Sequence, residues 1–158
     1  MLMTTRYTPT MTSGNVTVTG GTLTLSSNDD AVHADGKATI GGGNITVLRS
    51  YEGIEGNTVE ISGGSVSVIS SDDGLNATAT EGTGITISGG TLYVLAGGDG
   101  VDSNSRTQYG GILFAGGRSV IISTGRADSS IDTERGYSYT GGYVVGIGLS
   151  GGMGNEST

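Results

Sequence analysis

The chain has 158 residues and a mass of 15.7 kDa, enough for one domain, and its 32 glycines, single Phe and absent Trp exclude a conventional core of aromatic side chains. The net charge of −8 argues against nucleic acid as a partner, because phosphates are normally bound by Lys and Arg. The absence of cysteine excludes disulfides and thiolate metal sites, and no segment is apolar enough to span a membrane.

A Gly-Gly doublet recurs along the chain at intervals of 22, 21, 26, 27 and 25 residues. Each of the first four doublets is preceded and followed by a short run that alternates β-branched or aliphatic residues with polar ones, which is typical of half-buried strands. The doublets are Gly20-Gly21, Gly42-Gly43, Gly63-Gly64, Gly89-Gly90, Gly116-Gly117 and Gly141-Gly142.

A third short strand is predicted in each repeat. Ten residues after the first glycine of the first four doublets stands an acidic residue, followed by a small residue, an aliphatic one and a polar one. The fifth repeat keeps this pattern with three extra residues, as Ser129-Ser130-Ile131-Asp132. Three short strands per repeat, separated by glycine turns, predict an all-β fold: a right-handed parallel β-helix of about five coils.

We therefore expect an irregular N-terminal segment over residues 1–13, a parallel β-helix over 14–149 and a disordered Gly/Ser-rich tail over 150–158. Stacked coils turn inward positions into columns. The predicted columns are Val16, Ile40, Val59 and Ile85 in one, and Leu23, Ile45, Val66 and Leu92 in the next.

Stacking also turns the acidic residues into two rows. Close carboxylates repel each other, and an all-oxygen ligand set with a single His favours a hard cation, best matched by calcium. The alternative is that they are solvated turn residues, since Asp-Gly is a common turn dipeptide. The candidate calcium ligands are Asp29, Asp30, Glu52, Glu55, Asp72, Asp73, Asn76, Asp99, Asp102 and Asp132.

Tyrosines are the residues best suited to stack on sugar rings, because the chain has no Trp. The candidate carbohydrate-binding residues are Tyr51, Tyr93 and Tyr109 in the repeats, together with Arg49, which precedes Tyr51 and Glu52. No local arrangement of residues predicts a catalytic site.

The segments Ser50–Gly56, Ser62–Val68, Asp72–Ala77 and Gly98–Asn104 resemble a family of secreted bacterial carbohydrate-binding domains, formerly a domain of unknown function. The resemblance covers about Ser13 to Asp132. It implies a right-handed parallel β-helix similar to polysaccharide lyases, calcium on the acidic rows, an extracellular or cell-surface location, and binding of a plant-type polysaccharide such as cellulose or polygalacturonate.

The leading hypothesis is thus a non-catalytic, calcium-stabilised β-helix that binds polysaccharide. The second is a structural subunit whose coils stack head to tail into an extracellular filament through the open β-helix ends. The third is a pectate-lyase-like enzyme, which needs a Lys or Arg base beside the calcium, and Lys37 is the sole lysine. The glycan, the number of ions and the oligomeric state stay open.

Overall fold

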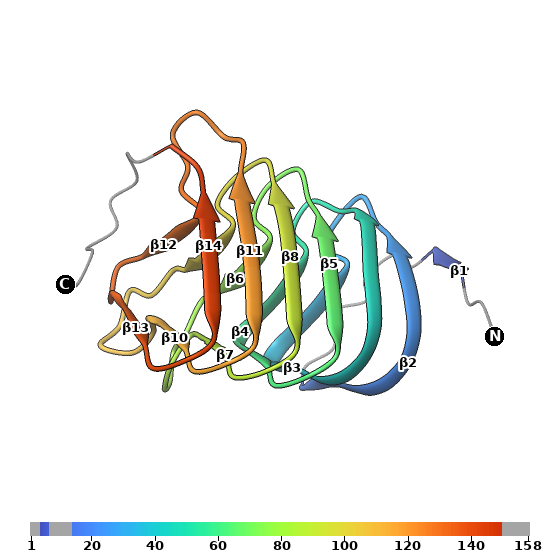
Figure 1. The fold of residues 1–158 in the computed structure, drawn as a ribbon, viewed down its shortest axis with the longest axis horizontal. Coiled ribbons are helices and arrows are strands. Elements are labelled where there is room, and N and C mark those ends of the chain that lie inside the picture. Colours follow the sequence, from blue (N-terminus) through green and yellow to red (C-terminus); the bar gives the residue numbers. More distant parts are fainter. Residues whose placement is uncertain (1–3, 7–13, 150–158) are drawn as a thin grey trace.

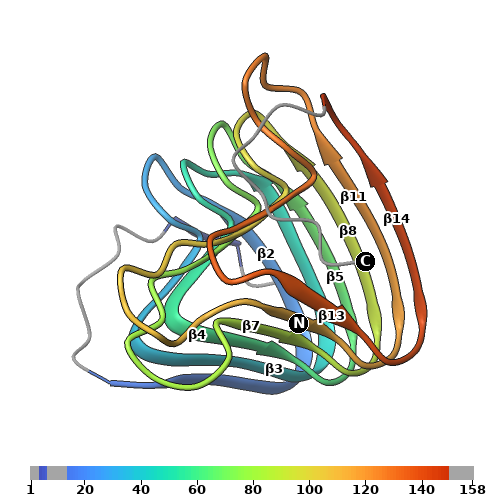
Figure 2. The same cartoon turned by 90° about the vertical axis from the view of Figure 1, so that its left-hand side faces the viewer.

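The computed structural model of the protein describes residues 4–6 and 14–149. In these residues the chain forms strands and no helix, so none is long and apolar enough to cross a membrane. The strands wind into a solenoid whose first coils (blue) and last coils (red) lie at opposite ends (Figure 1). Viewed along the axis, the coils enclose a triangular cross-section, and the chain turns counterclockwise as it advances toward the viewer, which is the right-handed sense (Figure 2). The predicted right-handed parallel β-helix is therefore confirmed.

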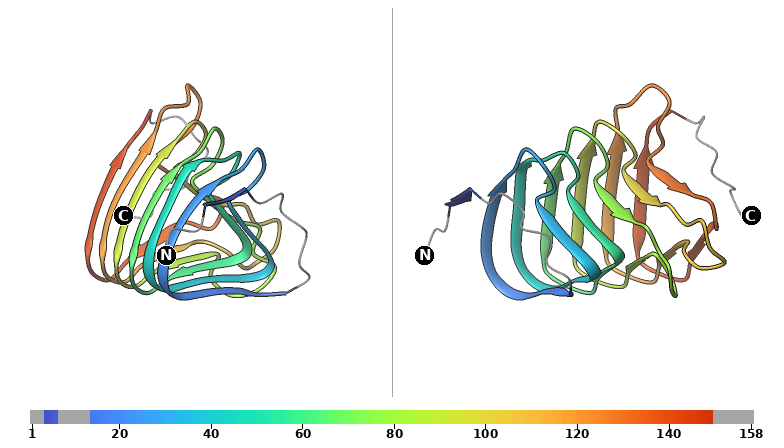
Figure 3. Two further views of the ribbon diagram at one scale, coloured as in Figure 1. Left: turned by 90° about the vertical axis from the view of Figure 1, so that its right-hand side faces the viewer. Right: turned by 180° about the vertical axis from the view of Figure 1, so that it is seen from behind.

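The solenoid has three faces, which Figure 3 shows from the other end and from behind. The first long strands bend around corners and contribute to more than one face. They are β2 (Val16–Ser26), β3 (Val32–Arg49) and β4 (Ile54–Ile61). Face A continues with β5 (Ser65–Ile69), β8 (Thr91–Ala96), β11 (Arg118–Ser123) and β14 (Tyr143–Ile147). Face B continues with β7 (Ile85–Ile87), β10 (Ile112–Phe114) and β13 (Tyr137–Tyr139). Face C continues with β6 (Leu75–Ala77), β9 (Val101–Ser103) and β12 (Ile131–Thr133).

Every strand pair is parallel and joins one coil to the next. On face C, Val32 pairs with Ile54, Ile54 with Leu75, and Leu75 with Val101. The strand β12 then places Ile131 on Val101, so the fifth repeat absorbs its three extra residues without losing register. The third strand predicted from the sequence is confirmed in all five coils.

The glycine doublets form the corner between face B and face A. The second glycine of each doublet has a positive φ, between 75° and 93°, a conformation that side chains other than glycine rarely adopt. A Cβ on Gly64 would also lie 2.7 Å from the carbonyl oxygen of Gly43. The doublet is thus required both for the turn and for the close stacking of successive corners.

The core consists of aliphatic columns on the inner side of each face. On face B the structure corrects one predicted column, because Val16 pairs with Ala38 and not with Ile40. Ile40 belongs to the next column, between Val18 and Ile61. Ala38 stands four residues before its doublet, as Val16, Val59 and Ile85 do, whereas Ile40 stands two residues before it. On face A, Leu23, Ile45, Val66 and Leu92 stack as predicted.

Within the segment 1–13, residues Thr4–Arg6 form strand β1, which pairs with Thr24–Ser26 of β2 and extends face A. The rest of the predicted irregular segment and the predicted tail 150–158 lie outside the described residues.

Candidate metal centre

The corner between face A and face C carries the first acidic row. The Gly53 amide donates to the carbonyl of Asp73 at 3.0 Å, and the Gly74 amide donates to that of Asp99 at 2.9 Å, so each coil repeats the turn of the last. The same ladder joins Ala31 to Glu52 at 3.1 Å. We call Asp30, Glu52, Asp73 and Asp99 the corner row.

Three residues further on, the outward positions of face C carry the second row. Strand pairing places His33 on Glu55, Glu55 on Asn76, Asn76 on Asp102, and Asp102 on Asp132. We call these five residues the face-C row. An inward aliphatic residue, such as Leu75 between Asp73 and Asn76, anchors the segment between the two rows in the core.

A glycine follows the acid in three of the coils and brings the two rows close together. A Cβ on Gly53 would lie 2.3 Å from Cγ1 of Val68, and one on Gly74 would lie 2.2 Å from Cγ1 of Val94. The backbone at these positions therefore rests directly on the core, and the acidic side chains on either side are half-buried or buried.

The first cluster joins the first two coils. Nδ1 of His33 lies 3.0 Å from Oδ2 of Asp30 and also contacts Oε2 of Glu55, while Nε2 lies 3.2 Å from Oδ1 of Asp35. One ligand atom from each of Asp30, His33 and Glu55 lies within 4.8 Å of the others. Burial lowers the pKa of His33, but the hydrogen bonds to Asp35, Asp30 and Glu55 outweigh it and the pKa is raised.

The second cluster joins the third and fourth coils. One carboxylate oxygen each from Asp73, Asp99 and Asp102 lies within 4.8 Å of the other two. The Asp99 amide donates to Oδ1 of Asp73 at 2.8 Å, and the Ser129 amide donates to Oδ1 of Asp99. Asn104 donates from its side-chain amide to Oδ2 of Asp102. These donors fix the orientation of the three carboxylates. The ligand atoms that this cluster offers to a cation are all oxygens.

Among the described residues, three buried acceptor oxygens in this region have no hydrogen-bond partner: Oε2 of Glu52, Oδ1 of Asn76 and Oδ1 of Asp102. Asn76 is 7% exposed and Asp102 is 4% exposed, so water does not reach these atoms freely. Asn76 donates its amide to Oε1 of Glu52 at 3.0 Å, which links the unpartnered oxygens into one polar layer. Acceptors without donors require a positive charge or a proton.

Burial and mutual repulsion raise the pKa of the carboxyl groups in this layer. Burial raises the pKa of Asp102 to about 8, with further contributions from the charges of Asp73 and Asp99. It likewise raises the pKa of Glu52 to about 7, and those of Asp73 and Asp99 to about 6. The hydrogen bonds from the Asp99 and Ser129 amides lower the pKa values of Asp73 and Asp99 but compensate only part of the effect of burial and repulsion.

The candidate ligands differ in where the structure places them. Asp30, Glu55, Asp73, Asp99 and Asp102 meet in the two clusters, and Glu52 and Asn76 lie between these clusters. Asp29, Asp72 and Asp132 stand outside both clusters. Oδ1 of Asp132 accepts the Thr133 amide at 2.8 Å.

The structure adds His33 and Asn104 to the site. His33 occupies a place in the face-C row, which is the signal in the sequence that points to it. Asn104 lies beyond the repeat pattern and carries no such signal.

The four candidate carbohydrate-binding residues are dispersed. The hydroxyl of Tyr51 hydrogen-bonds the carboxylate of Asp72, which raises the pKa of Tyr51. Tyr93 lies on the outer side of face A, and Tyr109 lies in the loop between β9 and β10. Arg49 donates to Oδ1 of Asn28 at 2.9 Å. Arg49 and Tyr51 thus lie beside residues 28–29 of the preceding coil, while Tyr93 and Tyr109 lie on other elements.

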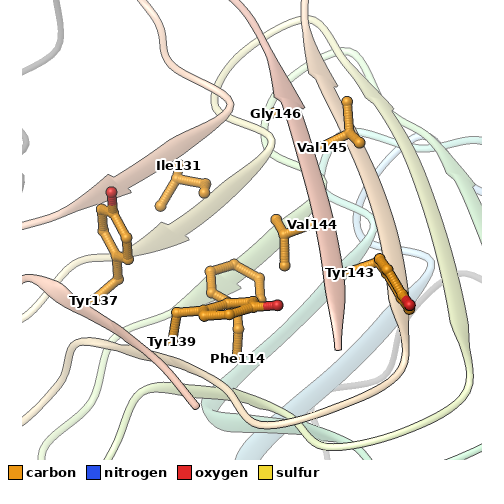
Figure 4. A pocket seen from close by; sticks show the side chains of 8 residues that line it. All are labelled: Phe114, Ile131, Tyr137, Tyr139, Tyr143, Val144, Val145 and Gly146. Carbon is orange, nitrogen blue, oxygen red and sulfur yellow. The ribbon is translucent and has the colours of Figure 1, made fainter. Parts of the chain in front are cut away.

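A cavity of about 420 Å³ lies at the last described coil. Its lining includes Phe114, Ile131, Tyr137, Tyr139 and Val144 (Figure 4). Tyr137 and Tyr139 continue the core columns of Ile112 and Phe114 by strand pairing, yet Tyr139 is 58% exposed. Within the described residues, the cavity thus lies at the end of the core.

The geometry defines a class of protein: a parallel β-solenoid with a layer of acidic and amide oxygens on one corner. A family model described as "Carbohydrate-binding domain-containing protein" matches residues 5–53, which contain the first coils and part of the first cluster. No curated protein and no solved structure matches the chain. The resemblance to carbohydrate-binding domains inferred from the sequence is confirmed by this match, which supports carbohydrate binding in general terms.

Proposed function

We propose that the protein is a non-catalytic, calcium-stabilised carbohydrate-binding β-helix that binds plant-type polysaccharide, cellulose or polygalacturonate, outside the cell or at its surface. The observation that carries the calcium part is the layer of three buried, unpartnered acceptor oxygens on Glu52, Asn76 and Asp102. The match to a carbohydrate-binding family model supports the class of ligand.

The residues present fit a calcium ion. Calcium accepts carboxylate and amide oxygens in flexible geometry, and the second cluster offers three carboxylates with the amide oxygen of Asn76 nearby. A bound ion supplies the positive charge that these oxygens lack and a bridge to the carboxylates of a uronate chain. Asp73, Asp99 and Asp102 would hold it, while the amides of Asp99 and Ser129 keep two of these carboxylates in place.

The arrangement favours binding over catalysis. A lyase-type reaction requires a basic side chain beside the cation. Nζ of Lys37, the sole lysine, forms an ion pair with Glu60 on face B. The acidic side chains stand in rows in which each carboxylate lies close to the next, as cation ligands do. They do not form a separated pair of a general acid and a nucleophile.

The test is a binding assay with polygalacturonate in calcium and in chelator at matched ionic strength, below the melting temperature of the calcium-free protein. We expect binding in calcium and at least about a tenfold loss in chelator, because the acidic protein and the acidic glycan repel each other without a cation between them. Matched ionic strength removes the effect of charge screening.

Binding that is equal in chelator would contradict the cation bridge. Failure to retain polygalacturonate, cellulose or any other plant polysaccharide under either condition would contradict the proposed function as a whole.

A second candidate is the structural subunit whose coils stack end to end. The cavity at the last described coil, where Tyr139 is 58% exposed, supports it, since an apolar end of a solenoid is stabilised by another coil. We expect sedimentation velocity in calcium to show species that lengthen with protein concentration. A single monomeric species throughout the concentration series would rule this candidate out.

A further inference from the structure

The outer side of face A changes its chemistry along the solenoid. In the first three coils its outward positions carry small hydroxyl and amide side chains, such as Thr24, Thr46 and Ser67, which pair along one ladder. The same ladder continues with Tyr93, Val120 and Val145 in β8, β11 and β14. The later coils therefore present an aromatic and aliphatic surface where the earlier ones present a polar surface.

These apolar side chains are exposed. Tyr93 is 41% exposed, Val120 is 37%, Val145 is 51% and Tyr143 is 72%. The neighbouring ladder adds Ile69 and Ile147, at 42% and 53%. A contiguous exposed apolar surface of this kind is typical of a binding site. We call the outward residues Tyr93, Arg118, Val120, Tyr143 and Val145 the platform.

The face-A parts of the described strands carry no negative charge. The described strands of face A contain no Asp or Glu, although the chain has 15 acidic residues. Arg118 is the charged residue of the platform, and its guanidinium lies 5.9 Å from the centre of the Tyr143 ring, where it helps to orient that ring. A neutral, flat ligand can thus cover these strands without stripping water from a carboxylate, which is costly elsewhere on the molecule.

We propose that the platform binds the flat face of a neutral β-glucan chain such as cellulose, at a site separate from the acidic corner that would engage a uronate glycan through calcium. This inference rests on the proposed function and assigns its two glycan classes to two surfaces. The rings of Tyr93 and Tyr143 stack on sugar rings through dispersion, and the aliphatic residues between them contact the apolar sugar face.

Face A is long enough to bind an extended polysaccharide chain. Six of its strands, β2, β3, β5, β8, β11 and β14, lie side by side (Figure 1) and span about 24 Å at a strand spacing of about 4.8 Å. A chain lying along the solenoid axis would cross from the platform onto the Thr and Ser ladders, whose hydroxyls can hydrogen-bond the sugar hydroxyls. A second copy of the protein would gain little from that polar half.

The experiment compares Tyr93→Ala, Tyr143→Ala and the double variant with wild type in binding to microcrystalline cellulose and to polygalacturonate, both in calcium. Tyr139→Ala is the matched control, because Tyr139 is 58% exposed and lies on β13 of face B, outside the platform. Thermal melting checks that each variant is folded. We expect the platform variants to lose cellulose binding by at least about tenfold, as truncation of an aromatic anchor does. Their polygalacturonate binding, and the binding of both glycans by Tyr139→Ala, should remain at wild-type levels.

Cellulose binding that survives in the double variant would overturn the platform, as would a wild type that retains polygalacturonate and not cellulose; in both cases the proposed function would stand. A wild type that binds no polysaccharide would overturn both. Sedimentation velocity gives a further outcome: a wild-type dimer that Val120→Asp dissociates, with cellulose binding unchanged, would make the platform a protein interface and overturn the inference.

Discussion

In chelator, the protein should lose stability as the pH rises from about 4 to about 8, and added calcium should remove most of that loss. Folding raises the pKa of Asp102 to about 8, of Glu52 to about 7, and of Asp73 and Asp99 to about 6. Between the unfolded and folded pKa values the native state binds more protons than the unfolded chain does, so the free energy of unfolding falls as the pH rises.

His33 contributes in the same direction. Its pKa is raised in the folded protein, so the stability that its protonated ring provides is present at low pH and is lost as the pH rises through the folded value. The measurement is a series of thermal melts from pH 4 to pH 8, with chelator and with calcium. A bound cation replaces the protons, and a saturating ligand at about 100 times its dissociation constant adds about 2.7 kcal/mol.

The variant Asp102→Asn should separate the two effects. At pH 8 it removes the carboxylate with the highest pKa, so the calcium-free variant should melt above the calcium-free wild type, while its gain from calcium should be smaller. Glu60→Gln is the control, because Glu60 lies on face B and pairs with Lys37, an exposed contact worth about 0–1 kcal/mol. Calcium-free stability that increases with pH in the wild type would contradict the picture of an uncompensated acidic layer.

The substitution Gly74→Ala should destabilise the protein by about 3 kcal/mol, at the upper end for overpacking of a core. The added Cβ would lie 2.2 Å from Cγ1 of Val94 and 2.4 Å from the carbonyl oxygen of Gly100, and the second contact is with backbone that cannot rotate away. For a chain of this size that loss lowers the melting temperature by about 6–12 °C. Because Gly74 lies between Asp73 and Asn76, the variant should also weaken stabilisation by calcium.

The control for this prediction is Gly20→Ala, since a Cβ at Gly20 would meet no atom within 4 Å. Equal melting temperatures for the two variants would show that the corner relaxes more easily than its packing indicates. In that case the close approach of the two acidic rows would not depend on glycine.

The sequence predicted the coils because the pattern of the turns is local. A glycine doublet needs a positive φ at its second residue, and the count of ten residues from Gly63 to Asp73 follows from the length of face A. The one misplaced column arose at Ile40, because Ala38 and Ile40 both point into the core and the prediction took the larger side chain, whereas the column runs through Ala38. Ser119 illustrates the same limit: its side chain points into the column of Leu92 and Val144.

The site was less accessible to such reasoning. The row positions of Asp73 and Asp102 follow from the repeat, but the three unpartnered oxygens depend on side-chain directions and on burial by neighbouring coils. The repeat does not predict the contact between His33 and three carboxylates either, since Asp35 lies outside both rows. The lack of acidic residues in the strands of face A can be read from the sequence. Strand pairing in the structure adds that Tyr93, Val120 and Val145 lie on one ladder.

Strand pairing between adjacent coils determines how this molecule folds and unfolds. Each strand contacts partners about one repeat away in the sequence, such as Leu75 with Val101, and in the part of the chain that the structure describes no strand pair joins distant coils. Such a chain behaves as a one-dimensional array, in which folding spreads from coil to coil and a defect lowers the stability of its immediate neighbours first. An ion held between the third and fourth coils would therefore stabilise the middle of the array, and folding would spread from these coils toward both ends.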